Sequence, residues 1–366
     1  MSAAVKTPLA QTRSPGGTGY ANARIRVARQ RLLSKEAIRA FLHEPSFASF
    51  FKRLSDSPYG PALTNALVTH AGVEAVSVAL ADDLRATYAW VYQLSEKRYR
   101  KLLETLAAKW DISDLKTIIR AKASGTPLHA DDPFRGIGVQ IAPEAISALA
   151  GQETISDVVA LVLTWGLPYQ RAFSEGLEDY LLKEDVADFE LRLDKAYAIW
   201  ATRRLRGPGQ AAAEARRVFG RWIDMLNIGT LIRLADTPDE VEEPLSYHLP
   251  GGLYLNARLF KYFVEASDLT ELLAGLKGAI PNYAEPLTSG DEGYQLTGHL
   301  SEFQRALEAW ATRCTISEGY RDILGFGVMQ SYLTAKENET TNLGIIAHGV
   351  YRGVTPSIIE KDLILV

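Results

Sequence analysis

The sequence predicts an all-α protein that contains three copies of one helical unit. Apolar residues recur at steps of three and four, which is the spacing of an amphipathic helix. No long run alternates apolar and polar residues with β-branched enrichment, so a sheet has little support. Three similar stretches recur 113 and 115 residues apart, at residues 114–120, 227–233 and 342–348. A unit repeated at this period is typical of a protein built for contact surface.

The copies differ in how closely they align. Gly138 and Gly252, Tyr169 and Tyr283, and Phe189 and Phe303 are each 114 residues apart, so copies two and three stay in register. The first copy needs insertions and deletions, because Tyr59 precedes Tyr169 by only 110 residues. A pentapeptide at 20–24 returns with four identities at 254–258, which we interpret as a link between the first and third copies.

Taken in order, the chain is expected to contain a flexible leader at 1–19 and helical repeats at 20–125, 136–236 and 252–366. Pro58, Pro168 and Pro281 each close a pair of shorter helices and lead to longer ones, since proline removes a backbone donor and clashes with the preceding turn. Ser113 is a candidate cap for a helix that begins at Asp114.

The longer helices carry narrow apolar seams. The second copy has Val186, Phe189, Leu193, Ala196 and Trp200, and the third has Leu300, Phe303, Leu307, Trp310 and Cys314. The first copy has Leu84, Tyr88, Val91 and Ser95 at the equivalent positions. Residues 200–203 also match residues 310–313 at a spacing of 110, so a register shifted by four residues stays open in this helix, and both registers keep the seam. Seams of this width predict packing against one or two antiparallel neighbours.

Composition excludes several classes of function. The 366 residues carry a net charge of −4, so the whole molecule is not drawn to nucleic acid or an anionic membrane. Cys314 is the only cysteine, which excludes an intramolecular disulfide. The longest stretch without a charged residue, 57–73, holds two prolines and several polar residues and does not predict a membrane span.

No pattern of residues predicts a cofactor, a metal or a bound nucleotide. The histidines lack the spacing of paired ligands on one helix face. The glycine-rich run at 16–19 follows no predicted strand and lacks the Gly-Lys-Ser/Thr ending of a phosphate-binding loop. We interpret Asp82 and Asp83 as a solvated helix face rather than a magnesium site.

Basic residues are the best candidates for partner binding. The candidate interface residues are Arg24, Arg26, Arg120, Arg203, Arg204 and Arg233. Ordinary helix surface is the alternative interpretation of each cluster. Arg120 and Arg233 recur at one position of the repeat, where an arginine can satisfy the last helical carbonyls or offer positive charge to a partner.

Three segments resemble a known family. Residues 20–26, residues 111–122 and residues 332–337, the last together with Asn342, Leu343 and Gly349, are similar to the C subunit of the archaeal and bacterial V/A-type rotary ATPases. The eukaryotic counterpart is the d subunit of the vacuolar ATPase. The resemblance covers residue 20 to the end; the leader and Gly344, where a basic residue is more usual, depart from it.

The resemblance implies a non-catalytic rotor part with the shape of a pseudo-threefold funnel. Such a part sits on the cytoplasmic face of the membrane-embedded proteolipid ring, receives the central-shaft subunits and transmits torque between ATP turnover and ion transport. It binds neither nucleic acid nor nucleotide directly. The helix ends near Arg120, Arg233 and His348 are then candidates for repeated lumen or rim positions.

Two other classes remain open. A superhelical adaptor of stacked helix pairs has repeats of about 34 to 47 residues, much shorter than the period found in this chain. An all-α enzyme is the other alternative, and the sequence offers no metal, nucleotide or nucleophile signature for one.

Overall fold

The computed structural model describes residues 17–128, 137, 141–236, 243–321 and 324–366. Every regular element in these ranges is a helix, which confirms the all-α prediction. Most of the expected leader at 1–19 lies outside the described residues, and the first helix, α1 (Thr18–Arg29), already begins at Thr18. The chain forms two compact units, residues 1–193 with 318–365 and residues 194–317 with 366.

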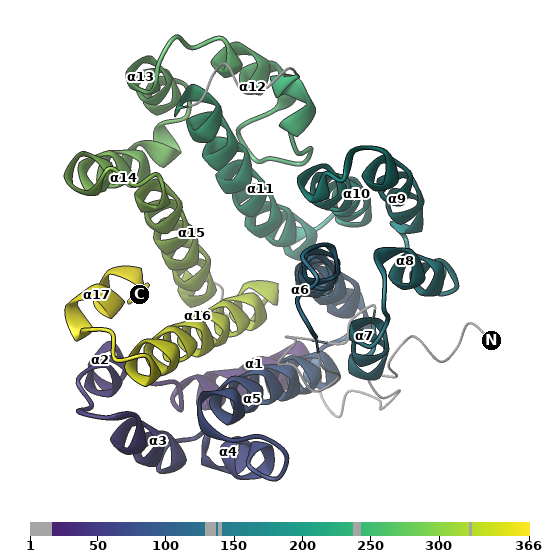
Figure 1. Ribbon diagram of the computed structural model, residues 1–366. Coiled ribbons are helices and arrows are strands. Elements are labelled where there is room, and N and C mark those ends of the chain that lie inside the picture. The colour runs from purple at the N-terminus through teal and green to yellow at the C-terminus, as the bar shows by residue number, and fades with distance from the viewer. Residues whose placement is uncertain (1–16, 129–136, 138–140, 237–242, 322–323) are drawn as a thin grey trace. The chain divides into compact units, whose positions relative to one another are not determined.

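Three short helices followed by two long ones occur three times along the chain (Figure 1). The first set is α2 (Lys35–Leu42), α3 (Phe47–Ser55), α4 (Gly60–Ala66), α5 (Gly72–Leu94) and α6 (Lys97–Ala123). The second set is α7 (Pro143–Ala150), α8 (Ile155–Leu163), α9 (Gln170–Lys183), α10 (Val186–Arg204) and α11 (Gln210–Asp236). The third set is α12 (Ala257–Val264), α13 (Leu269–Ala279), α14 (Ala284–Thr297), α15 (Ser301–Arg321) and α16 (Phe326–Tyr351).

Within the described residues, three short elements besides α1 lie outside these sets. The 3-10 helices η2 (Pro244–Tyr247) and η3 (Pro281–Tyr283) flank α12 and α13, and α17 (Pro356–Asp362) follows α16. The recurring order of lengths is the one that a triplicated unit would produce. The repeat ranges 20–125, 136–236 and 252–366 themselves stay a prediction.

Packing is offset from these sets by one helix. The last long helix of each of the first two sets packs on the first two short helices of the next: α6 on α7 and α8, and α11 on α12 and α13. The last helix of the third set, α16, packs on α2 and α3 of the first set, and on α1 and α5. We call α16 with α1–α5 the first packing group, α6 with α7–α9 the second, and α11 with α12–α14 the third.

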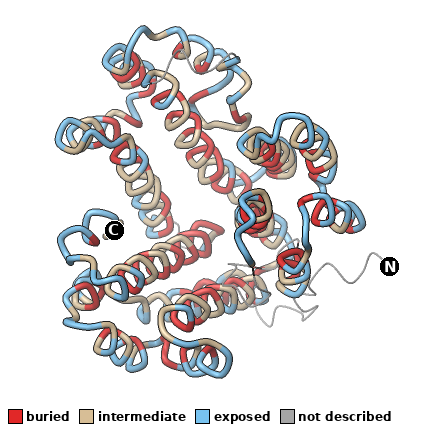
Figure 2. The backbone as a smooth tube through the Cα atoms, viewed as in Figure 1, coloured by how far each residue is buried: buried red, intermediate tan, exposed pale blue. Residues whose placement is uncertain are grey.

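The recurring stretches supply the apolar face of these long helices. In the first packing group Leu343, Ile346 and Ala347 are buried in a core with aromatic residues of α2 and α3 and with Tyr59, which directly precedes α4. In the third, the equivalent Ile228, Leu231 and Ile232 are buried against α12, α13 and η3. Figure 2 shows the resulting buried stripe along α11 and along α16. Burying one such aliphatic side chain stabilises the fold by roughly 1.5–3 kcal/mol.

One expectation about a helix start is wrong. Ser113 lies in the middle of α6, which runs unbroken from Lys97, so Ser113 caps nothing. The matching pentapeptides occupy different settings: Asn256 is the N-cap of α12, with its side chain accepting from the backbone of Arg258 and Leu259, whereas Asn22 is buried inside α1 and donates to the Gly325 carbonyl. The true counterpart of Asn256 is Ser34, the N-cap of α2.

The predicted seams of α10 and α15 are buried at Phe189 and Leu193 and at Phe303 and Leu307, and only partly at Trp200 and Cys314. Each phenylalanine packs against a glycine on the preceding helix. A Cβ on Gly176 of α9 would lie 2.4 Å from the Phe189 ring, and one on Gly290 of α14 would lie 2.6 Å from the Phe303 ring. Both members of the two pairs are 114 residues apart, which agrees with the register read from the sequence.

Gly290→Ala is expected to lower the free energy of unfolding by about 1–3 kcal/mol, because the added methyl group also meets the Phe303 backbone at 2.8 Å and cannot be accommodated by a ring flip alone. Urea unfolding followed by circular dichroism measures the change. The matched control is Gly278→Ala on α13, where a Cβ meets nothing within 4 Å. That substitution should be neutral or stabilise by about 0.5 kcal/mol; equal effects at the two positions would contradict the packing argument.

Candidate functional site

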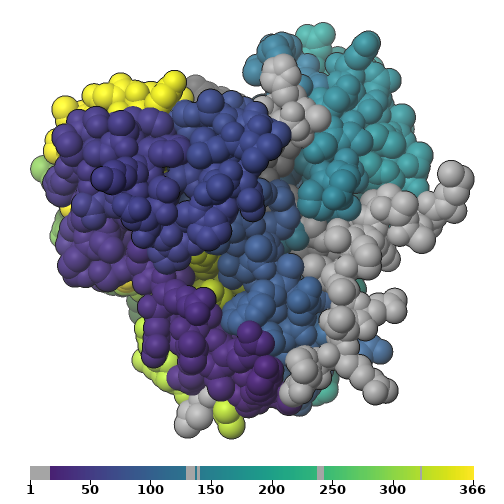
Figure 3. Space-filling view, turned by 90° about the horizontal axis from the view of Figure 1, so that it is seen from below, coloured from purple at the N-terminus to yellow at the C-terminus, as the bar shows by residue number. Residues whose placement is uncertain are grey.

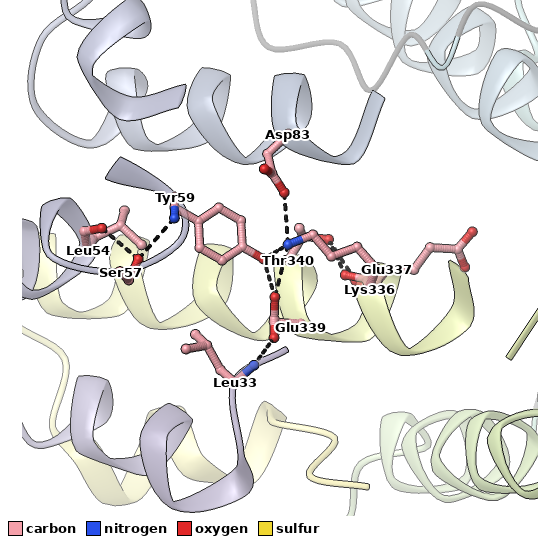
Figure 4. A network of polar contacts seen from close by, with 9 residues as sticks. All are labelled: Leu33, Leu54, Ser57, Tyr59, Asp83, Lys336, Glu337, Glu339 and Thr340. Carbon is pink, nitrogen blue, oxygen red and sulfur yellow. Dashed lines mark hydrogen bonds and ion pairs between the residues drawn. The ribbon is translucent and has the colours of Figure 1, made fainter. Parts of the chain in front are cut away.

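A buried carboxylate on α16 holds together three elements of the first packing group (Figure 4). Glu339 Oε1 accepts hydrogen bonds from the Tyr59 hydroxyl at 2.6 Å and from Lys336 Nζ at 3.0 Å. Its other oxygen accepts the backbone N–H of Leu33. Lys336 Nζ also donates to the Tyr59 hydroxyl at 2.8 Å and pairs with Asp83 of α5 at 2.8 Å. One helical turn therefore binds α5, the entry to α4 and the entry to α2.

The network lies almost out of reach of water. Tyr59 is fully buried, and Lys336 and Glu339 are 6% and 4% exposed. Burial, and then the neighbouring Glu339 charge, raise the pKa of the Tyr59 hydroxyl well above its ordinary value, so it stays a donor. Burial also raises the pKa of Tyr332, one turn before Lys336, to about 12. Because a buried charge is tolerated only when it is paired, these positions allow few substitutions.

Asp224 on α11 likewise accepts from a tyrosine hydroxyl and from backbone N–H groups in the third packing group. Its Oδ1 accepts the backbone N–H of Leu255 at 3.0 Å, and its Oδ2 accepts that of Tyr254 at 2.9 Å and the Tyr283 hydroxyl at 3.1 Å. Burial raises the pKa of the Asp224 carboxyl, and these hydrogen bonds partly oppose the rise. Gly252 makes room for the close approach, since a Cβ there would lie 2.3 Å from Asp224 Oδ1.

The two sites correspond residue by residue. Glu339 and Asp224 are 115 residues apart; Leu33 and Leu255 each precede an N-cap; and Tyr59 and Tyr283 each precede the third short helix of their set. The second packing group has the same residue types at the same places. Its members are Asp111 on α6, Ile141 before the Ala142 N-cap, and Tyr169 before α9, and all three are buried.

A second acidic residue of α16 links it to α5 and α6. Glu337 Oε1 accepts from the Tyr88 hydroxyl and from Trp110 Nε1, the latter at 3.1 Å, and its Oε2 accepts from Lys109 Nζ at 2.9 Å. Neighbouring residues of α16 thus carry buried or half-buried polar bonds to different helices. Such bonds fix the rotation and the axial position of a helix, which apolar contacts alone leave adjustable.

The candidate arginines of α1 and α10 lie on the surface. Arg24 and Arg26 are exposed; Arg24 donates to the Tyr20 hydroxyl at 3.3 Å and lies 5.7 Å from the Trp90 ring centroid. Arg203 is exposed, and the half-buried Arg204 lies 5.3 Å from the ring centroid of Trp200. Their use as a partner interface stays a prediction.

The recurring arginines each make a side-chain contact with another residue. Arg120 forms a bidentate ion pair with Glu190 of α10, with N–O distances of 2.7 and 2.8 Å. Arg233 donates to the Thr230 hydroxyl on its own helix at 3.2 Å. His348, at the equivalent place on α16, lies 3.0 Å from Ser77 of α5, and burial followed by the nearby Arg352 charge lowers its pKa. Arg120 therefore has a structural task in joining α6 to α10.

The recurring stretches, as defined from the sequence, start one helical turn after the acidic residues and so leave them out. Asp111, Asp224 and Glu339 lie three residues before Asp114, Asn227 and Asn342, and a carboxylate at the same place in three copies was the available signal. The interpretation of Asp83 was also wrong: its side chain is 26% exposed and pairs with the buried Lys336. Asp82, in contrast, is 43% exposed and pairs with Arg85.

Within the described ranges no three residues of the metal-ligating types come together, and no helix there is both long and apolar enough to cross a membrane. What the described residues assemble is a set of long helices joined by buried polar bonds. This is the arrangement of a helical scaffold, a part whose work is done through its shape and its contacts.

Comparison with known proteins identifies the family. The family model for the ATP synthase (C/AC39) subunit matches residues 21–362, and the chain belongs to this family. It is 28% identical over 348 residues to the C subunit of the A-type ATP synthase of Methanocaldococcus jannaschii, covering 94% of this chain and 86% of that protein. It is 24% identical over 349 residues to the C subunit of the V-type ATP synthase of Deinococcus radiodurans, covering 95% and 92%.

Family membership makes the chain a non-catalytic subunit of a rotary ATPase and confirms that part of the resemblance. It also excludes the alternative of an unrelated helical adaptor.

Lys336→Met is expected to lower the free energy of unfolding by about 3–5 kcal/mol, because Asp83 and Glu339 would lose their shared cation while Glu339 stays buried. Urea unfolding measures the loss. Adding Glu339→Gln to this variant should recover part of it, since one uncompensated charge is then removed.

The matched control is Lys277→Met in the other unit. Lys277 Nζ is 3.7 Å from Asp291, and the two side chains are 28% and 33% exposed. A pair of this kind contributes less than about 1 kcal/mol. Similar losses for the two methionine variants would show that burial of the Lys336 network does not matter.

Asp224→Asn tests the raised pKa of Asp224 through the pH dependence of stability. A carboxyl whose pKa is higher in the folded state favours folding most when protonated, and this contribution is lost as pH rises through the folded-state pKa. The stability advantage of the parent chain over Asp224→Asn should therefore shrink as the pH is raised from about 4, the ordinary pKa of an aspartic acid, into the neutral range. Urea unfolding across this range measures it, with Glu265→Gln, an exposed carboxylate of the same unit, as control. An advantage that grows with pH would contradict the sign of the shift.

Proposed function

We propose that this chain is the central-rotor socket of a V/A-type rotary ATPase, a counterpart of the d subunit of the eukaryotic vacuolar ATPase. In this role it joins the central-shaft subunits to the membrane-embedded proteolipid ring on the cytoplasmic face of the membrane. It transmits torque between ATP turnover and the movement of protons or sodium ions. The three-copy, pseudo-threefold funnel expected from the resemblance belongs to the same proposal.

The buried carboxylate bonds are the observation that best supports this role. A part that transmits torque must resist sliding and rotation of its helices, and apolar faces alone resist both only weakly. Glu339 and Asp224 each tie a long helix to the entries of two short helices by directional bonds in a buried setting. Directional bonds in a dry environment are lost when a helix movement stretches the donor–acceptor distance to about 3.6 Å or bends the bond angle to about 100°.

The partner surface is proposed to include the surface arginines. Arg24 and Arg26 on α1 and Arg203 at the end of α10 are exposed, and Arg204 lies half-buried beside the Trp200 ring, so their positive charge is displayed at the surface. Arg120 and Arg233 are kept as weaker candidates, because Arg120 already serves the pair with Glu190. Charge on an interface steers association and selects partners more than it adds affinity.

Pull-down of a tagged copy from detergent-solubilised membranes tests the role. The parent chain should recover both shaft and proteolipid-ring subunits. The double variant Arg203→Glu, Arg204→Glu should recover at least one of them about ten-fold less well, because each reversal places like charge against the partner. Arg171→Glu is the control for charge reversal as such: it reverses one arginine charge, half the change of the double variant, on a side chain that is 88% exposed and outside the proposed surface.

The outcomes separate the role from the interface. If the parent chain recovers neither partner, the socket role is rejected. If the parent and every arginine variant recover both partners equally, the role stands and the assignment of the interface to these arginines is rejected.

A further inference from the structure

Two asparagines at equivalent positions hold a stretch of extended backbone in the same way. On α11, Asn227 Oδ1 accepts the N–H of Leu249 at 2.8 Å, and its Nδ2 donates to the carbonyl of Leu249 at 2.9 Å. On α16, Asn342 Oδ1 accepts the N–H of Ile364 at 3.0 Å, and its Nδ2 donates to the carbonyl of Ile364 at 2.8 Å. In both cases the residue held lies 22 positions after the asparagine.

The segments that lead to these bonds are also alike. A short helix that begins with proline precedes each, η2 before Leu249 and α17 before Ile364. The 3-10 helix η2 contacts α11 and α12, and α17 contacts the corresponding helices α16 and α2. Figure 3 shows the yellow C-terminal residues lying against the purple N-terminal helices. The two segments therefore take the same path over a long helix.

The two segments differ in how they are joined to the next short helices. After Leu249 the chain continues directly to Leu255, which donates to Asp224, and enters α12. The corresponding bond to Glu339 comes from Leu33, which lies before α16 in the sequence and not after Ile364. In the third packing group, the segment held by the asparagine also connects one set of helices to the next. In the first packing group, the C-terminal segment occupies the corresponding place but does not continue into α2.

We propose that the C-terminal segment, residues 354–365, is a built-in substitute for that connector and locks α16 onto the first short helices of the chain. Its attachment is specific rather than only apolar. Asn338 adds a second donor to the Ile364 carbonyl at 2.8 Å, and Arg39 of α2 pairs with Glu360 at 3.3 Å. Ile359 and Leu363 are buried in the core of the group.

The lock opens independently of the connector in the other unit. Asn342 and Ile364 belong to the unit of residues 1–193 and 318–365, whereas Asn227 and Leu249 belong to the unit of residues 194–317. The segment held by Asn342 is not covalently continuous with α2, so its detachment does not displace the start of that helix. The segment held by Asn227 continues directly into α12, so its detachment would. The lock goes beyond the proposed socket role and does not depend on it.

Hydrogen exchange of the purified full-length chain, followed by mass spectrometry, tests the proposal. Asn342→Ala should speed exchange in the peptide that contains Ile364 on the order of ten-fold or more, since one donor and one acceptor of the lock are lost. The peptide that contains Leu249 should be unchanged. Asn227→Ala is the matched control and should speed exchange at Leu249 while leaving Ile364 protected.

A gentler variant keeps the test usable if Asn342→Ala does not fold. Asn342→Asp retains the acceptor for the Ile364 N–H and loses the donor to its carbonyl, and aspartate is the residue that the first copy carries at the equivalent Asp114. Exchange at Ile364 should then be intermediate between the parent and Asn342→Ala. The proposal is overturned if these variants leave Ile364 as protected as in the parent, or if each asparagine variant speeds exchange equally at both sites.

Discussion

The constraint on which the structure depends is a buried carboxylate near the middle of a long helix, facing a tyrosine and a backbone N–H from another set of short helices. Asp224 and Glu339 meet this constraint with side chains of different length, and each accepts from a tyrosine hydroxyl and from the backbone N–H of a leucine. The apolar residues one and two turns later can pack in several registers. The carboxylate selects one, because any other would leave a charge buried without its donors.

This constraint also explains why the packing groups are offset from the repeats. Asp224 belongs to the end of one set of helices and its donors belong to the beginning of the next, so the bond is made across a boundary in the sequence. Glu339, on α16, finds its donors only in the first set, at Leu33 and Tyr59. The packing of α16 therefore joins residues from opposite ends of the chain. Many contacts between residues far apart in sequence predict slow folding.

The sequence was sufficient for the fold class and for the register of copies two and three, because helical periodicity and the pairs Gly176 with Phe189 and Gly290 with Phe303 are local or in strict register. It was insufficient where a side chain's role depends on another segment. From the sequence alone, Asp83 cannot be told from an exposed acidic residue of a helix, because its partner Lys336 lies in a distant segment. In the same way, the sequence does not show that Arg120 pairs with Glu190. The two matching pentapeptides differ in structure for the same reason, since an asparagine caps a helix or lies inside one according to where the neighbouring chain enters.

Buried ion pairs seldom make a protein more stable than well-packed apolar residues would, so stability alone does not explain Lys336, Glu337 and Glu339 on one helix. Their effect is geometric. Apolar helix faces tolerate small slides and rotations at low cost, whereas the bonds of Glu337 to Trp110 and Lys109 and of Glu339 to Tyr59 each specify a distance and a direction. In the rotor role that we propose, the chain must turn without shearing, so such specificity would matter more than extra stability.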